Sequence, residues 1–275
     1  MSEASTGPVA LRRNGVECWK IKKYNDIEKH KIESVTEITN SPSPLFYFTF
    51  EDDSDNTDII DESNSANEHE GTGSGTQRDS TAIRGSYSLD IDTADTLTID
   101  HHTDLDWDYD DSWSVSAWVK HNSGLYRGIY VKREGTPGYK GPAVYLLTGK
   151  VQGYLISNWT ASNASIHRQT TTTINDNAWH HVVVTYDGSG NDTGMLCYID
   201  GSLDTTFATQ SSRTTVGTNT TTNSFNARVG SASDNTGQGI NGLIDEVAVW
   251  NIVLTADQVS ALYNNGDGAN IESGL

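Results

Sequence analysis

The sequence has little cysteine, and its hydrophobic runs are short. Cys18 and Cys197 are the only cysteines among 275 residues, which excludes the disulfide framework of small secreted domains. The apolar runs have the length of strands rather than of membrane spans, and the N-terminus lacks the apolar segment of a signal peptide. We therefore expect neither membrane insertion nor export through a signal peptide.

Basic residues are also scarce, with 18 Lys and Arg against 37 Asp and Glu and a net charge of -19. Residues 1–45 hold seven basic and six acidic side chains, so the other 230 residues carry a charge of -20. Nucleic-acid binding requires basic side chains that neutralise phosphates, so we exclude nucleic acid as a partner. Solubility explains the acidic surface most simply, and cation binding is the alternative.

One stretch predicts a β-hairpin, the segment 177–201 with the sequence NAWHHVVVTYDGSGNDTGMLCYIDG. Residues 180–186 alternate between the two faces of a strand in a β-branched run. The DGSGN segment that follows tolerates positive φ angles, and residues 195–200 resume as a second strand. Cys197 alternates with apolar neighbours there and is expected to be an inert core thiol.

Three blocks together resemble the laminin-G-like, concanavalin A-like jelly-roll modules. They are WHHVVVTYDG followed by YIDG in the hairpin, SWSVSAWV at 112–119, and GLIDEVAVW at 242–250. A short helix usually follows the last block in that family, and residues 254–263 fit it, with a capping box at Thr255 and Gln258. The resemblance implies an all-β fold, a two-sheet antiparallel jelly-roll sandwich with a short C-terminal helix.

We divide the chain into an N-terminal arm with its linker, residues 1–44, and the sandwich, residues 45–275. The aromatic run LFYFTF at 45–50 is predicted to be the first strand, and further strands are expected at 86–91, 128–132, 143–147, 153–157 and 227–230. Residues 71–75 are expected to form a flexible glycine turn. The arm has too little apolar material for a core of its own. We therefore expect residues 1–44 to pack on other protein subunits.

A structural calcium ion is one hypothesis for the acidic residues. Jelly-roll relatives often bind calcium where the loop after the first strand meets an acidic residue of the last strand, and the resemblance places Asp52, Asp61 and Asp245 there. Carboxylates are ligands that hard cations prefer. The alternative is a solvated acidic loop, with Asp245 bonded to backbone amides.

Carbohydrate binding is the second hypothesis, because exposed aromatic rings stack on sugars and polar side chains bond to their hydroxyls. Trp118, Trp179 and Trp250 belong to the family blocks and are expected in the core. Five aromatic residues in less constrained segments are the predicted ligand contacts: Trp107, Tyr126, Tyr139, Tyr154 and Trp159.

No catalytic pattern is evident. The run of carboxylates on one strand that jelly-roll glycosidases use, E-x-D-x-(x)-E, is absent, and His180 and His181 fit structural roles on a strand. We expect a non-enzymatic surface module for glycan or protein adhesion, of the decoration or fibre type and located on a virion or an extracellular surface. The alternatives are a polysaccharide hydrolase or lyase, and a soluble calcium-dependent lectin.

Overall fold

The computed structural model describes residues 10–13, 16–19, 42–51, 57–63, 65–135, 137–206, 214–232, 238–269 and 271. The chain divides into two compact units, and the boundary in the sequence lies between Asn40 and Ser41. In the first unit, β1 (Ala10–Arg13) pairs antiparallel with β2 (Val16–Trp19). None of the helices among the described residues is long and apolar enough to span a bilayer.

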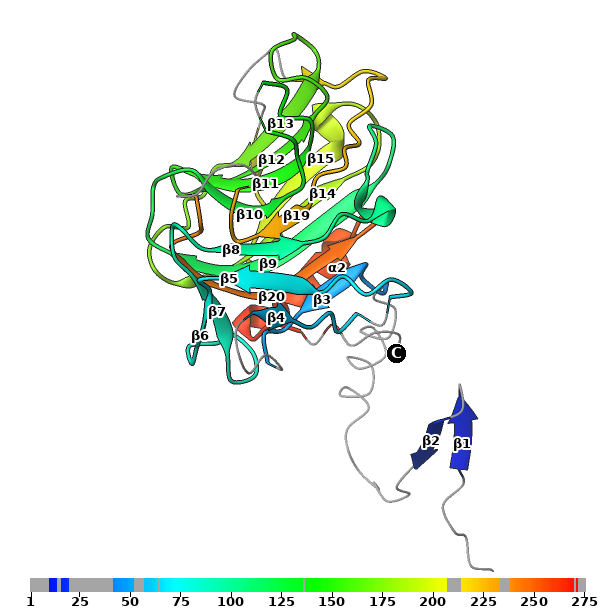
Figure 1. The fold of residues 1–275 in the computed structure, drawn as a ribbon, viewed down its shortest axis with the longest axis vertical. Coiled ribbons are helices and arrows are strands. Elements are labelled where there is room, and N and C mark those ends of the chain that lie inside the picture. Colours follow the sequence, from blue (N-terminus) through cyan, green and yellow to red (C-terminus); the bar gives the residue numbers. More distant parts are fainter. Residues whose placement is uncertain are drawn as a thin grey trace, which may run out of the picture. The chain divides into compact units, whose positions relative to one another are not determined.

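The second unit is a sandwich of two antiparallel sheets (Figure 1). The strands of the ten-stranded sheet are, in order, β17 (Thr205–Thr206), β13 (Ser165–Thr170), β12 (Lys150–Ile156), β11 (Gly141–Leu147), β10 (Arg127–Val131), β19 (Ala227–Val229), β8 (Thr96–Ile99), β5 (Gly71–Ser74) and β4 (Asp58–Ile59), with β18 (Thr214–Thr215) also on β13. Those of the eight-stranded sheet are β16 (Ser202–Leu203), β15 (Met195–Ile199), β14 (Trp179–Tyr186), β9 (Trp113–His121), β20 (Gly242–Trp250), β7 (Ser88–Ile91) and β6 (Gln77–Asp79), with β3 (Phe46–Phe48) also on β20.

The main core lies between the two sheets, because alternate side chains of each strand point inward. Val115 and Val184 come from the eight-stranded sheet, and Leu146 and Leu155 come from the ten-stranded sheet. All four are almost fully buried, and a side chain of this size contributes about 1.5–3 kcal/mol when it leaves water. The predicted two-sheet all-β fold is confirmed.

The outer face of the eight-stranded sheet is covered by α2 (Ala256–Tyr263). Val259 and Leu262 of this helix pack with Val183 and Trp250 of the sheet in a second apolar cluster. The predicted capping box is present, with the Thr255 side chain accepting from a backbone amide of the first turn. The helix ends at a left-handed residue, Asn264.

A β-bulge interrupts β20, where the pairing with β9 shifts by one residue between Asp245 and Ala248. Glu246 lies in the bulge and has a positive φ of 50°. On the other side of β20, β7 pairs with the residues before the bulge and β3 with the residues after it. The bulge therefore separates β20 into two differently paired halves.

Most predicted strands are confirmed: the hairpin corresponds to β14 and β15, and the other predicted strands correspond to β3, β7, β9, β10, β11, β12, β19 and β20. The expectation for residues 71–75 was wrong. Gly71–Ser74 form β5, and a side chain at Gly71 would collide with Leu97 of the neighbouring strand. Gly71 therefore allows β5 and β8 to pack closely. Strand β13 has no counterpart among the predictions.

Candidate functional site

Six aromatic side chains gather on the outer face of strands β10 to β13, away from the main core. We call this group the aromatic face, and its members are Tyr126, Tyr139, Tyr145, Tyr154, Trp159 and His167. They pack over small and aliphatic residues of the same sheet, including Val131 and Ala143. The sheet therefore has apolar contacts on both faces in this region.

The strand register explains how these residues meet. Ala143 of β11 lies opposite Tyr154 of β12, which lies opposite His167 of β13. Their immediate neighbours Val144, Leu155 and Ile166 point into the main core. Because side chains alternate between the faces of a sheet, every second residue of these three strands lies on the same side of the sheet as the aromatic face.

Ring contacts run continuously across the aromatic face. Tyr126 stacks on Tyr145 with centroids 4.2 Å apart, and Tyr145 meets Tyr154 edge to face at 6.0 Å. Tyr154 lies 5.8 Å from Trp159, which meets Tyr139 edge to face at 6.2 Å. Offset and edge-to-face pairs of this kind add about 0.5–1.5 kcal/mol each beyond their burial. The rings thus form one connected surface.

Polar and cationic groups accompany the rings. The Arg133 guanidinium lies 4.5 Å from the ring centroid of Tyr139 and 5.2 Å from that of Tyr145. The Tyr154 hydroxyl donates to Gln152 at 2.7 Å, and the Gln152 amide donates to Gln169 on β13 at 3.3 Å. The outer face therefore combines aromatic surface, amide groups and one positive charge.

The members differ in exposure. Tyr145 and His167 are buried and Tyr154 is 8% exposed, whereas Tyr126, Tyr139 and Trp159 are half-buried. The accessible part of the aromatic face is thus formed by the three half-buried rings, and the buried rings support them.

Four of the five predicted ligand residues come together here. Trp107 is the exception and requires correction, because it is only 3% exposed and stacks on Trp113 of the core with centroids 5.3 Å apart. It has no ring face available to a sugar. The predictions also missed Tyr145 and His167, although Tyr145 alternates with core residues in a strand that was expected.

The four strands below the aromatic face contain neither aspartate nor glutamate. A glycosidase of this architecture requires two carboxylates about 5–10 Å apart across the substrate. These strands cannot supply that pair.

The predicted calcium residues that lie in the described part of the chain bind backbone amides. Asp61 accepts hydrogen bonds from the amides of Tyr47, Ser63 and His69 at 2.9–3.0 Å. It thereby organises the loop between β4 and β5. Asp52 lies outside the described residues.

Asp245 is fully buried and accepts hydrogen bonds from the amides of Ile83 and Glu246, both at 2.9 Å. Burial and the neighbouring Glu246 carboxyl raise the pKa of Asp245 to about 8, against the effect of its amide donors. Burial also raises the pKa of Glu246 to about 7, although Glu246 accepts a hydrogen bond from the Tyr47 hydroxyl. Within the described residues, Asp61 and Asp245 do not form a common ligand cluster. Calcium binding stays a prediction.

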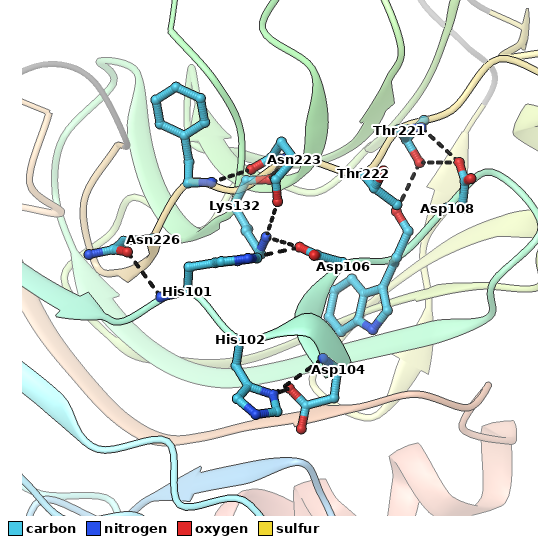
Figure 2. A network of polar contacts seen from close by, with 12 residues as sticks. His101, His102, Asp104, Asp106, Asp108, Lys132, Thr221, Thr222, Asn223 and Asn226 are labelled. Carbon is cyan, nitrogen blue, oxygen red and sulfur yellow. Dashed lines mark hydrogen bonds and ion pairs between the residues drawn. The ribbon is translucent and has the colours of Figure 1, made fainter.

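A second polar region lies in the loop after β8 (Figure 2). The ammonium group of Lys132 is buried, forms an ion pair with Asp106 and donates to the carbonyl of Asn223 at 2.8 Å. Burial lowers the pKa of Lys132, and Asp106 opposes that effect. Thr221, which lies with Asn223 in the loop before β19, donates to the carbonyl of Trp107 at 2.9 Å. These contacts connect the loop after β8 and the loop before β19 to Lys132, which directly follows β10.

Three further side chains of this region converge, and the sequence did not predict them as a site. His69 Nε2 lies 3.0 Å from one Asp104 oxygen, and His102 Nδ1 lies 2.6 Å from the other. The three ligand atoms lie within 4.8 Å of one another. In the sequence, His102 follows His69 by 33 positions, so no local motif indicates the cluster.

The histidines of the hairpin have structural partners. His181 is buried, its Nε2 lies 2.9 Å from the Ser116 hydroxyl, and burial lowers its pKa to about 3. His180 lies 2.9 Å from Asp200, whose hydrogen bond raises the pKa of His180. Burial raises the pKa of the Cys197 thiol to about 12, so this cysteine is inert at neutral pH.

The fold and the sequence define the class of this protein. The family model of the concanavalin A-like lectin/glucanases superfamily matches residues 91–260, and the chain belongs to that family. This confirms the resemblance noted in the sequence. A search of curated protein sequences found no match.

Solved structures of similar fold include binding domains of a mosquitocidal protein and of neurotoxins. The binding domain of Paraclostridial Mosquitocidal Protein 1 has 16% sequence identity and a TM-score of 0.60, with 82% of this chain and 52% of that chain covered. The Botulinum Neurotoxin serotype G binding domain has 16% identity and a TM-score of 0.57, with coverages of 80% and 50%. The binding domain of Botulinum Neurotoxin DC in complex with SialylT has 14% identity and a TM-score of 0.55, with coverages of 82% and 52%.

This chain thus spans about half the length of the structures that it resembles. At these identities the likeness shows the fold alone, which is the two-sheet sandwich described above. The SialylT of the third structure belongs to that complex and does not locate a site in this chain.

Proposed function

We propose that this chain is a non-enzymatic glycan-binding module and that the aromatic face is its binding surface. The observation that carries the proposal is the convergence of Tyr126, Tyr139 and Trp159 as half-buried rings at the edge of one aromatic cluster. Half-buried rings offer flat apolar surface to the face of a sugar while their supported side stays rigid. Gln152 and Arg133 lie beneath these rings and are almost fully buried, so they hold the rings in place.

The lack of acidic residues in the four strands below the aromatic face supports binding rather than hydrolysis. Arg133 also places a positive charge beside the rings, although the chain as a whole has a net charge of -19. A hydrolase or lyase would have to place its carboxylates elsewhere. Incubation with a bound polysaccharide should release no new reducing or unsaturated ends.

A glycan array with the full-length chain tests the proposal. The Trp159→Ala and Tyr126→Ala variants should each weaken binding about tenfold or more, a loss of about 1.4 kcal/mol. Tyr87→Ala is the control, because Tyr87 is an accessible tyrosine (38% exposed) that lies 3.7 Å from an arginine, Arg78, and directly precedes β7 of the other sheet. It should leave the affinity unchanged.

Failure of the wild type to bind any glycan, or equal losses in Trp159→Ala and Tyr87→Ala, would overturn the proposal. Thermal melts of the variants separate loss of binding from loss of fold. The same assay in a calcium chelator tests the calcium-dependent lectin. Undiminished binding would exclude that alternative.

The anchoring of residues 1–44 on other subunits stays a prediction, as does the location on a virion. Most of residues 1–41 lie outside the described residues. Co-purification of the full chain with particles, and its loss when residues 1–44 are deleted, would be the corresponding measurement.

A further inference from the structure

The cluster of His69, His102 and Asp104 is formed by the pairing of two strands. In the antiparallel pair β5 and β8, Gly71 lies opposite Ile99. His69 comes two residues before this pair and His102 three residues after it, so both side chains reach the same end of the sheet. Asp104 belongs to the short helix η1 (Thr103–Leu105), for which His102 is the N-cap.

Each side chain is held in place by its surroundings. The amide of His69 donates to Asp61 at 3.0 Å, and its ring meets Phe46 of the core edge to face. The Asn67 amide donates to Asp104 at 2.9 Å. Metal sites commonly have such additional hydrogen bonds, which fix the orientation of the ligands.

The exposure of the cluster suits a bound ion. The side chain of His69 is 2% exposed, that of Asp104 is 23% exposed and that of His102 is 42% exposed. An ion could therefore enter from the solvent side and keep one position open for water. Two imidazole nitrogens with one carboxylate oxygen are typical ligands of zinc, in contrast to the all-oxygen sites of calcium.

We propose that His69, His102 and Asp104 form a binding site for a divalent transition-metal ion of the zinc class. The ion would join the loop between β4 and β5 to the loop after β8 at one end of the ten-stranded sheet. The site is distinct from the aromatic face, and it contacts one predicted calcium residue, Asp61, only through the His69 amide. It does not depend on the glycan proposal.

The test uses the untagged full chain, freed of metal by a chelator and titrated with Zn²⁺ by calorimetry. We expect one saturable zinc per chain, together with a higher melting temperature. Co²⁺ in place of zinc should give the visible absorption bands of a site with nitrogen and oxygen ligands. His102→Ala and Asp104→Asn should abolish these signals, and Asn67→Ala should weaken affinity about tenfold.

His101→Ala is the matched control, because His101 is the adjacent histidine, is 30% exposed and lies 3.6 Å from Asp106 rather than Asp104. It should bind zinc like the wild type. Absence of saturable zinc binding would overturn the proposal and would leave a hydrogen-bonded His-Asp-His cluster without a metal. Equal losses in His101→Ala and His102→Ala would also overturn it, because zinc would then bind nonspecifically along the loop.

Discussion

The rings of Tyr154 and His167 lie parallel on neighbouring strands, with centroids 4.3 Å apart and an angle of 8° between their planes. His167 thus supports the ring against which the half-buried Trp159 packs. His167→Ala should lower the free energy of unfolding by about 0.5–1.5 kcal/mol and weaken glycan binding, because Trp159 loses its rigid support. His167→Phe retains a stacking ring and should restore both quantities. Equal behaviour of the two variants in denaturation and binding would contradict this role.

The buried ion pair between Lys132 and Asp106 should make a large contribution to stability. Lys132→Met removes the positive charge and leaves Asp106, which is 20% exposed, without its partner. We expect a loss of about 2–4 kcal/mol in the free energy of unfolding, measured by urea denaturation, because an unpaired charge in a low-dielectric site is costly. The double variant Lys132→Met with Asp106→Asn should recover part of that loss. A double variant less stable than Lys132→Met would show that Asp106 is needed independently of the pair.

The stability of the protein should depend on pH through Glu246. Burial raises the pKa of this carboxyl from 4.5 to about 7 in the folded state, so its protonated form favours folding. The stabilisation is complete below the ordinary glutamate pKa and is lost as the pH rises through about 7. Glu246→Gln stays neutral and should gain about 1–3 kcal/mol relative to the wild type between about pH 5 and pH 9. Parallel stability profiles for the two proteins would refute the assignment.

Gly153 should be required for close packing of the two sheets. A Cβ atom at this position of β12 would lie 2.7 Å from the Met195 sulfur and 2.9 Å from a methyl group of Val184. Gly153→Ala should therefore cost about 1–3 kcal/mol in thermal or chemical unfolding. Gly124→Ala is the control, because nothing lies within 4 Å of the added methyl group there. A cost as small as that of the control would mean that the sheets separate easily at this point.

Sequence patterns were sufficient for strands whose apolar residues alternate with a regular period. The hairpin of β14 and β15 and the capped helix α2 follow from residues that are neighbours in the chain. The glycine strand β5 could not be recognised, because it has no side-chain pattern and its extended shape depends on pairing with β8. Local sequence therefore predicts elements better than it predicts their partners.

The candidate sites show the same limit. Tyr126, Tyr139 and Trp159 could be predicted as ligand contacts because they lie outside the family blocks. The support from His167 could not be predicted, because it depends on the register of β12 with β13. Trp107 looked like an exposed loop residue, and only its stacking on Trp113 removes it from the surface. The zinc-class cluster could not be predicted, because two loops distant in the sequence supply its ligands.

The bulge in β20 determines how this strand would respond to the deletion of one residue. Before it, Ile244 points into the main core, and after it Val247 and Val249 do so, with Trp250 on the opposite face under α2. Because of the extra residue, the inward-facing positions are even-numbered before the bulge and odd-numbered after it. Deleting Glu246 would restore an even alternation from Ile244 onward, with Val247 and Val249 still in the core and Trp250 still under α2. A shortening by one residue at the bulge would thus preserve the two faces of everything that follows it.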